Sequence, residues 1–197
     1  MLSKEEEHIV KGCCKSDRKS QKKLYDLFAK KMLVVALRYA DGKQEAEDIL
    51  QESFIKVFNY ISSFRKDCPL ENWIKKIVIN TALNTNRSKL YLYPAVDVEN
   101  TDLKNLLADD PYVISSLHYE QLLEIIHQLP TSYRTIFNLY AIEGYQHNEI
   151  AAMLDISEGT SKSQYARAKI FLQRVLKKYE ENQEDTKSTF QKDKKVK

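Results

Sequence analysis

The residues best suited to chemistry in this 197-residue chain are cations on one segment near its C-terminal end. Between Gly159 and Lys178 there is no acid, and there are six basic residues: Lys162, Arg167, Lys169, Arg174, Lys177 and Lys178. Helical spacing puts one stripe inward, formed by Ser161, Tyr165, Ala168, Leu172 and Val175, and leaves Lys162, Ser163, Ala166, Arg167 and Arg174 opposite. Basic and hydroxyl groups arranged in this way bind phosphates and base edges. The chemistry indicated is recognition of a polyanion.

The residues before this segment predict a helix-turn-helix. Residues 149–154 have the pattern of a short helix with Ile150, Ala151 and Leu154 inward, and residues 155–157 form a turn. Ser157 is a good N-cap for the helix that follows. A compact helix, a tight turn and a basic helix together are typical of a unit that enters the DNA major groove. A solvated charged face is the alternative, and the acid-free run with the tight turn favours DNA binding.

A second candidate site lies on the helix expected over residues 46–61. Its apolar stripe leaves an acidic strip on the other face, formed by Asp48, Gln51, Glu52 and Ile55. Acids on a helix are normally just a solvated face. An exposed isoleucine among them favours a protein-binding strip that meets a basic partner.

A third candidate site is an aromatic and basic loop that leads into a helix. The loop contributes Phe64, Arg65 and Lys66, and the helix carries Trp73 and then Lys76, Asn80, Asn84 and Arg87 along one face. Aromatic rings stack on unpaired bases, amides read base edges and cations hold phosphates. The segment therefore suits single-stranded nucleic acid, although Trp73 is equally suited to a core.

Helices must position all of these residues. Ser3 and Glu6 form a capping box, and further helical patterns run through Leu24, Leu27, Phe28, Met32, Val35 and Tyr39, through residues 46–61, and through residues 70–78. No segment alternates with the period of a strand. Seven acids and one lysine lie between Tyr91 and Glu124. We expect an all-α chain with a helical bundle at 1–90, an acidic flexible linker at 91–115, a helix-turn-helix domain at 116–179 and a disordered tail at 180–197.

Composition excludes several classes of protein. A hydrophobic fraction of 43% argues against disorder, and 4 Gly and 4 Pro exclude collagen-like chains and a Gly-rich phosphate loop. His8, Cys13 and Cys14 lack the spacing of a metal site, and His118, His127 and His147 are scattered. We expect no cofactor, no metal, no small-molecule substrate and no enzyme. Without a signal peptide or an apolar run of the ~20 residues a membrane span needs, a cytoplasmic protein is expected.

Four segments in order resemble a known family. They are Leu24–Phe28, Glu45–Phe54, Phe64–Asn80 and the helix-turn-helix, and together they are similar to bacterial RNA polymerase sigma factors of the compact extracytoplasmic-function group. The resemblance covers roughly residues 5–90, as a region-two-like domain, and 116–178, as a region-four-like domain. It implies a transcription initiation factor without chemistry of its own.

The resemblance assigns roles to the three candidate sites. It implies that Asp48, Gln51, Glu52 and Ile55 bind core polymerase, whose clamp helices in the largest subunit and flap are the expected contacts. It implies that the loop and helix from Phe64 to Arg87 open the minus-ten element. It implies that the minus-thirty-five element is read by Gly159, Thr160, Lys162, Ser163, Ala166, Arg167 and Lys169. An anti-sigma factor, often membrane-embedded, is a further expected partner.

Two residues depart from the family pattern. Ser161 stands where a valine is usual, and Gln164 stands where an arginine is usual. Burial of an unsatisfied hydroxyl costs about 1–3 kcal/mol unless it bonds back to the helix backbone. The alternative function is a dimeric helix-turn-helix regulator, and a helical adaptor is a third possibility. The regulator accounts for residues 116–178 but not for the acidic strip or the aromatic loop.

Overall fold

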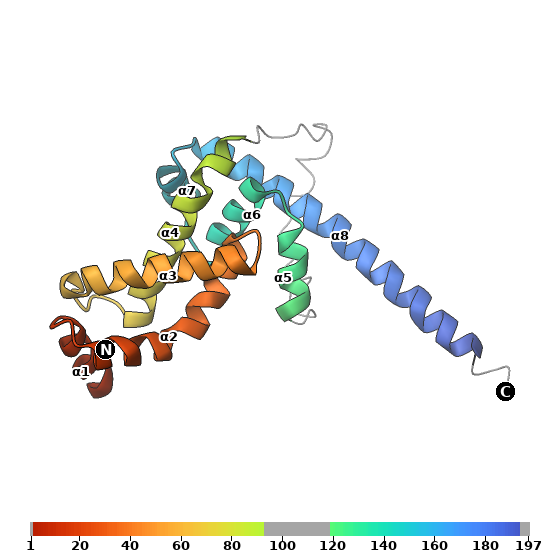
Figure 1. The fold of residues 1–197 in the computed structure, drawn as a ribbon. Coiled ribbons are helices and arrows are strands. Elements are labelled where there is room, and N and C mark those ends of the chain that lie inside the picture. Colours follow the sequence, from red (N-terminus) through yellow and green to blue (C-terminus); the bar gives the residue numbers. More distant parts are fainter. Residues whose placement is uncertain (1, 93–118, 194–197) are drawn as a thin grey trace. The chain divides into compact units, whose positions relative to one another are not determined.

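The computed structural model describes residues 2–92 and 119–193, so residues 93–115 of the expected linker lie outside the described part. Every regular element in the described ranges is helical, and these ranges contain no strand, which confirms the all-α class. The chain divides into two compact units, Met1–Leu92 and Tyr93–Lys197 (Figure 1). Within the described residues, no helix has the length and apolar character needed to cross a membrane.

The N-terminal unit is a bundle of four α-helices. They are α1 (Lys4–Cys13), α2 (Arg18–Tyr39), α3 (Lys43–Tyr60) and α4 (Leu70–Leu92), with the short 3-10 turn η1 (Ile61–Ser63) after α3. α2, α3 and α4 all pack against one another, and α1 packs on α2. The core they share includes Leu24, Phe28, Met32, Tyr39, Ile49, Phe54, Ile74 and Val78. Burial of these side chains against neighbouring helices stabilises the bundle.

Side-chain caps fix the corner between α1 and α2. Ser3 and Glu6 form the predicted capping box, with Oγ of Ser3 accepting from the Glu6 amide at 3.1 Å. Asp17 caps α2 by accepting from both the amide and the hydroxyl of Ser20, at 2.9 and 2.7 Å. A Cβ on Gly12 would lie 2.0 Å from Oγ of Ser20, so glycine permits the close approach of α1 and α2 here.

Two details of the N-terminal unit differ from the sequence prediction. Leu27, expected on the buried stripe of α2, is 49% exposed. The buried residues of α2 follow Leu24, Phe28 and Met32, and Leu27 lies at the edge of that stripe. α4 also continues to Leu92, although helical periodicity weakens near residue 88.

The C-terminal unit consists of shorter helices around one long helix. Its elements are α5 (Tyr119–His127), α6 (Thr131–Phe137), the π-helical turn η3 (Asn138–Ile142), α7 (His147–Leu154) and α8 (Glu158–Asp193). α6 and α7 both pack on α8. The core cluster is formed by Ile125, Ile126, Leu129, Tyr133, Phe137, Ala168 and Leu172.

α8 extends into residues 180–197, the segment expected to be a disordered tail. The helix runs through that segment to Asp193. Residues 180–193 contain neither glycine nor proline and several good helix formers, so backbone propensity favours continuation of the helix beyond its packed part.

Candidate nucleic-acid and protein interfaces

The helix-turn-helix has the local geometry that its sequence predicts. Asp155, in the left-handed conformation with φ 55°, ends α7. Ser157 begins α8, and its Oγ accepts from the Thr160 amide at 3.0 Å, which confirms the predicted N-cap. Ile150 is fully buried as expected, whereas Ala151 and Leu154 are only half-buried. The turn therefore holds the first residues of α8 in a defined direction from α7.

Ser161, where the family pattern has valine, is completely buried and has a polar partner. Its Oγ lies 2.9 Å from Nδ1 of His147 on α7. The ring of His147 stacks on Tyr140, with centroids 4.2 Å apart and planes 12° apart. Burial, followed by the charge of Lys162, lowers the pKa of His147, and Glu158 opposes this shift. The sequence prediction missed this contact because it joins residues of two different helices.

The expected outward face of α8 is largely accessible. Gly159 and Lys162 are exposed, and Thr160, Ser163, Arg167 and Lys169 are half-buried. Two of the polar groups bond within the helix: Lys162 pairs with Glu158 at 2.6 Å, and Ser163 donates to the Thr160 carbonyl at 3.0 Å. Because surface pairs of this kind are weak, Lys162 remains able to exchange its partner for a phosphate.

Ala166 and Lys169 differ from the simple picture of an exposed recognition face. Ala166 was expected on the accessible side, but it is buried, with 8% of its surface exposed. Its methyl group projects less than the longer side chains beside it on the helix, so it lies below the surface they form. Nζ of Lys169 lies 5.6 Å above the ring of Tyr165, a cation–π contact that turns this lysine along the helix.

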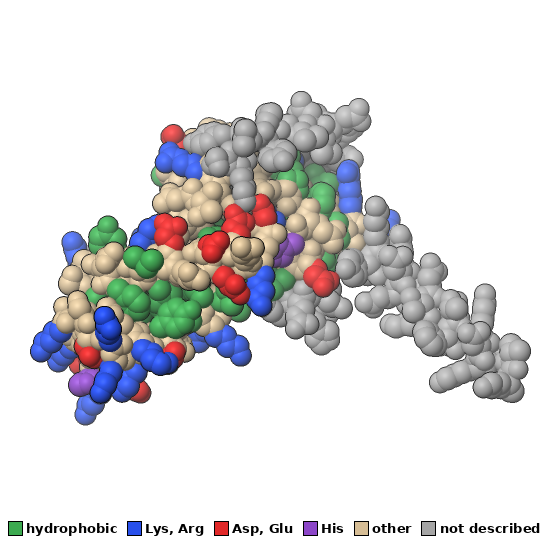
Figure 2. Space-filling model, in the orientation of Figure 1, with side chains coloured by type: hydrophobic (Ala, Val, Ile, Leu, Met, Phe, Trp, Pro, Cys, Tyr) green, Lys and Arg blue, Asp and Glu red, His purple; other side chains and the backbone are tan. Residues whose placement is uncertain are grey.

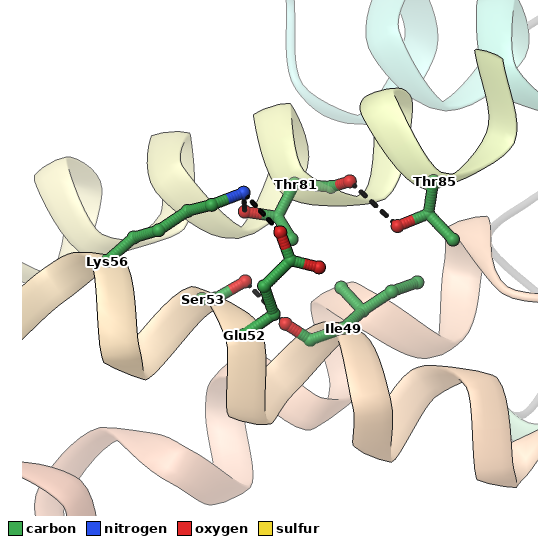
Figure 3. A network of polar contacts seen from close by, with 6 residues as sticks. All are labelled: Ile49, Glu52, Ser53, Lys56, Thr81 and Thr85. Carbon is green, nitrogen blue, oxygen red and sulfur yellow. Dashed lines mark hydrogen bonds and ion pairs between the residues drawn. The ribbon is translucent and has the colours of Figure 1, made fainter.

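The strip on α3 is exposed at each of its four positions, Asp48, Gln51, Glu52 and Ile55. The exposure predicted for Ile55 is confirmed at 61%. Glu52 also has a neighbour on its own helix, Lys56, whose Nζ lies 2.6 Å from Oε1 of Glu52 and donates to Oγ1 of Thr81 on α4 at 3.2 Å (Figure 3). The acidic strip is thereby joined to α4 through one lysine.

The sequence prediction missed further exposed apolar side chains on the N-terminal unit. Tyr25 and Leu27 on α2 and Tyr60 at the end of α3 are exposed. The ring of Tyr25 packs edge-on against Phe54 of α3, with centroids 4.7 Å apart. Figure 2 shows hydrophobic side chains gathered on the face over α2 and α3. The sequence offered one signal for this exposed apolar surface, namely apolar residues of α2 that lie outside its buried stripe.

The aromatic loop divides into a buried and an exposed part. Phe64 is only 9% exposed, and its ring packs on that of Trp73 with centroids 5.3 Å apart. Little of the Phe64 ring is therefore accessible, and its expected stacking on bases stays a prediction. Arg65 and Lys66 are exposed, and Lys66, at φ 65°, pairs with Glu7 of α1 at 3.2 Å.

α4 presents the predicted polar row. Lys76, Asn80, Asn84 and Arg87 are all exposed. The core side chains Ile74, Val78 and Ala82 lie on its other side and are fully buried. The half-buried Trp73 lies at the beginning of this row, next to the loop. One face therefore combines an accessible aromatic edge, amides and cations.

Comparison with known proteins gives a consistent result for both units. Residues 24–89 match the family model "Sigma-70 region 2", and residues 119–172 match "Sigma-70, region 4". The chain is 27% identical over 186 residues to the RNA polymerase sigma-H factor of Pseudomonas aeruginosa, covering 89% of this chain and 96% of that protein. It is 28% identical over 177 residues to the ECF RNA polymerase sigma-E factor of Haemophilus influenzae, covering 85% and 93%.

A solved structure of sigma factor RpoE from Bartonella quintana, in complex with the anti-sigma factor NepR, aligns with a TM-score of 0.48 and 23% identity. The alignment covers 79% of this chain and 96% of that one.

A helical bundle with an exposed acidic strip and a polar, basic helix, together with a helix-turn-helix unit, defines a two-part DNA-binding transcription protein. The matches to sigma-70 regions 2 and 4 narrow this class of protein to one family. The chain belongs to the bacterial RNA polymerase sigma factors of the extracytoplasmic-function group. It is a transcription initiation factor that binds core RNA polymerase and directs it to promoters, and the dimeric regulator considered above is not favoured.

Proposed function

We propose that the strip on α3 is the surface by which the chain binds core RNA polymerase. The observation that carries this assignment is Ile55, an isoleucine 61% exposed beside the carboxylates of Asp48 and Glu52. An apolar anchor with acids around it suits a partner with a basic, partly apolar surface, and the clamp helices of the largest subunit are the expected contact. Gln51 adds an amide to the same strip.

The test is co-elution of the full chain with core RNA polymerase on a sizing column. Asp48→Lys/Glu52→Lys is expected to abolish co-elution. Glu5→Lys/Glu124→Lys reverses two exposed acids elsewhere and serves as the matched control. Retained binding by the first variant, or equal loss by both, contradicts the assignment.

We infer that the loop and α4 open the minus-ten element. Arg65, Lys66, Lys76 and Arg87 provide cations for the phosphates, while Asn80 and Asn84 provide amides for unpaired base edges. Trp73 is the ring accessible to a base, and Phe64 holds it from behind. Trp73→Ala is expected to reduce permanganate reactivity of the minus-ten thymines in the holoenzyme, without loss of polymerase binding.

The first turns of α8 are proposed to read the minus-thirty-five element in the major groove. Gly159, Thr160, Lys162, Ser163, Arg167 and Lys169 are the contact residues, and the buried Ala166 provides clearance. With one DNA-binding surface in each unit, the linker joins two separately weak contacts, so neither unit alone is expected to hold a promoter tightly.

Three coarser expectations complete this proposal. The chain contributes binding and no catalytic step of its own, since polymerase carries the chemistry. It acts in the cytoplasm, where that enzyme works. An anti-sigma factor is expected to cover the exposed apolar side chains Tyr25, Leu27 and Ile55, and it would then compete with core polymerase in the co-elution assay.

A further inference from the structure

The corner between α1 and α2 is the most basic surface of the N-terminal unit that the proposed function leaves unused. Residues 11–23 contain one acid, Asp17, and six cations, for a net charge of +5. The cations, all exposed, are Lys11, Lys15, Arg18, Lys19, Lys22 and Lys23. Figure 2 shows basic side chains around this end of the unit. We call this surface the basic corner.

The fold does not neutralise the basic corner. Lys22 pairs with Asp26 at 2.7 Å. The remaining cations form no ion pair with any residue that the structure describes. The carboxylate of Asp17 is engaged by Ser20, which lowers its pKa and leaves it as the cap of α2. The charge therefore exceeds what folding requires and is available to an external polyanion.

The basic corner adjoins the loop assigned to the minus-ten element. Glu7 on α1 pairs with Lys66 of that loop at 3.2 Å. Lys11 follows Glu7 by four residues on the same face of α1, which places it about 6 Å further along the helix axis. Lys11 therefore lies on the side of α1 that faces this loop, and α1 packs on α2, where the remaining cations begin.

The residue types indicate how this surface binds. Five of the six cations are lysines, which act as point charges, whereas base reading favours the planar fork of arginine. Residues 11–23 include no aromatic residue on which a base could stack. Such a surface suits contacts with the sugar–phosphate backbone, and its binding does not depend on the base sequence.

We propose that the basic corner binds the phosphates of promoter DNA where the strand continues beyond the minus-ten element. This inference rests on the proposed role of the loop and α4, and it extends the promoter contact around the end of the unit. Its contribution is electrostatic, so it must depend on salt concentration and not on base sequence.

The experiment uses holoenzyme assembled from core polymerase and the full chain. The DNA is a promoter fragment on which this holoenzyme starts run-off transcription. Binding is measured over a range of KCl concentrations for Lys19→Gln/Lys23→Gln. The control, Lys4→Gln/Lys30→Gln, removes two exposed lysines of the same unit that lie outside the basic corner. A second fragment, with altered bases beside the minus-ten element, tests sequence dependence. Thermal melting checks that both variants fold.

Each phosphate contact contributes about 0.7–0.9 to the slope of log K against log salt concentration, so the test variant should flatten this slope by about 1.4–1.8. The flattening should be equal on both fragments, and the control should leave the slope unchanged. An unchanged slope in the test variant, as an acidic protein partner would produce, overturns the inference. So does equal flattening by both variants, or an effect on only one fragment. Failure of the unmodified chain to form holoenzyme would instead overturn the proposed function.

Discussion

Nδ1 of His147 on α7 and Oγ of Ser161 on α8 lie 2.9 Å apart, and this contact joins the two helices of the DNA-binding motif. At this position, where the resemblance leads one to expect an apolar valine, this chain has a buried polar contact. The stacking of His147 on Tyr140 orients the ring for it. The direction of α8 from α7 therefore depends on a group that can take up a proton.

Stability of the C-terminal unit is expected to depend on pH through His147. Its pKa is lowered from 6.5 in the folded chain, so the folded state binds its proton less readily than the unfolded state does. The stability that neutral His147 supports is present above 6.5 and is lost as the pH falls through the lower folded-state pKa. Melting temperatures across this window measure the effect. His147→Gln should reduce this pH dependence, whereas His8→Gln on α1 should leave it unchanged.

Removal of the Ser161 hydroxyl should destabilise the unit despite its small size. Ser161→Ala leaves Nδ1 of the half-buried His147 without this partner, and a lost partner of this kind costs about 1–3 kcal/mol. Urea denaturation gives the change in the free energy of unfolding. A double-mutant cycle with His147→Phe isolates the contact, and additive effects of the two changes would show that it contributes nothing.

Arg167→Ala should weaken promoter binding several-fold at the minus-thirty-five element. The half-buried Arg167 belongs to the accessible face of α8, and its loss removes a donor to phosphates or guanine acceptors. A footprinting titration with holoenzyme measures the affinity. Lys177→Ala removes an exposed cation about 15 Å further along the same helix and should have little effect. Unchanged affinity for Arg167→Ala would remove this residue from the interface.

The three cysteines should differ sharply in reactivity. Cys13 is buried on α1, which packs on α2. This burial, with smaller effects of Cys14 and Asp17, raises the pKa of Cys13 to about 11. Since the thiolate is the reactive form, iodoacetamide at pH 8 should modify the exposed Cys14 and Cys68 and spare Cys13. Peptide mass spectrometry identifies the modified residues. Modification of Cys13 at a similar rate would indicate that α1 detaches readily from α2.

Local patterns in the sequence predicted local structure well. The capping box at Ser3, the N-cap at Ser157 and the exposure of Ile55 each depend on residues within a few positions of one another, and the structure confirms them. Contacts between distant segments could not be predicted in this way. The Phe64–Trp73 pair buries a ring expected to bind DNA, and the partner of Ser161 comes from the preceding helix.

The same limit applies to the edges of elements. Leu27 matches helical spacing but is half exposed, because the width of a buried stripe depends on the neighbouring helices. The tail after residue 180 has a polar composition typical of disorder, yet its backbone propensity permits the helix that α8 forms.

Gly12 has a consequence for the far side of its helix. Oγ and Cβ of Ser20 would lie 2.0 and 2.6 Å from any Cβ at residue 12, and Asp17 holds the Ser20 hydroxyl in place. A single added methyl group must therefore displace Ser20, α1 or the start of α2. Glu7 belongs to α1 and forms the ion pair with Lys66. Through this pair, a change at the α1–α2 contact can also reach the loop before α4.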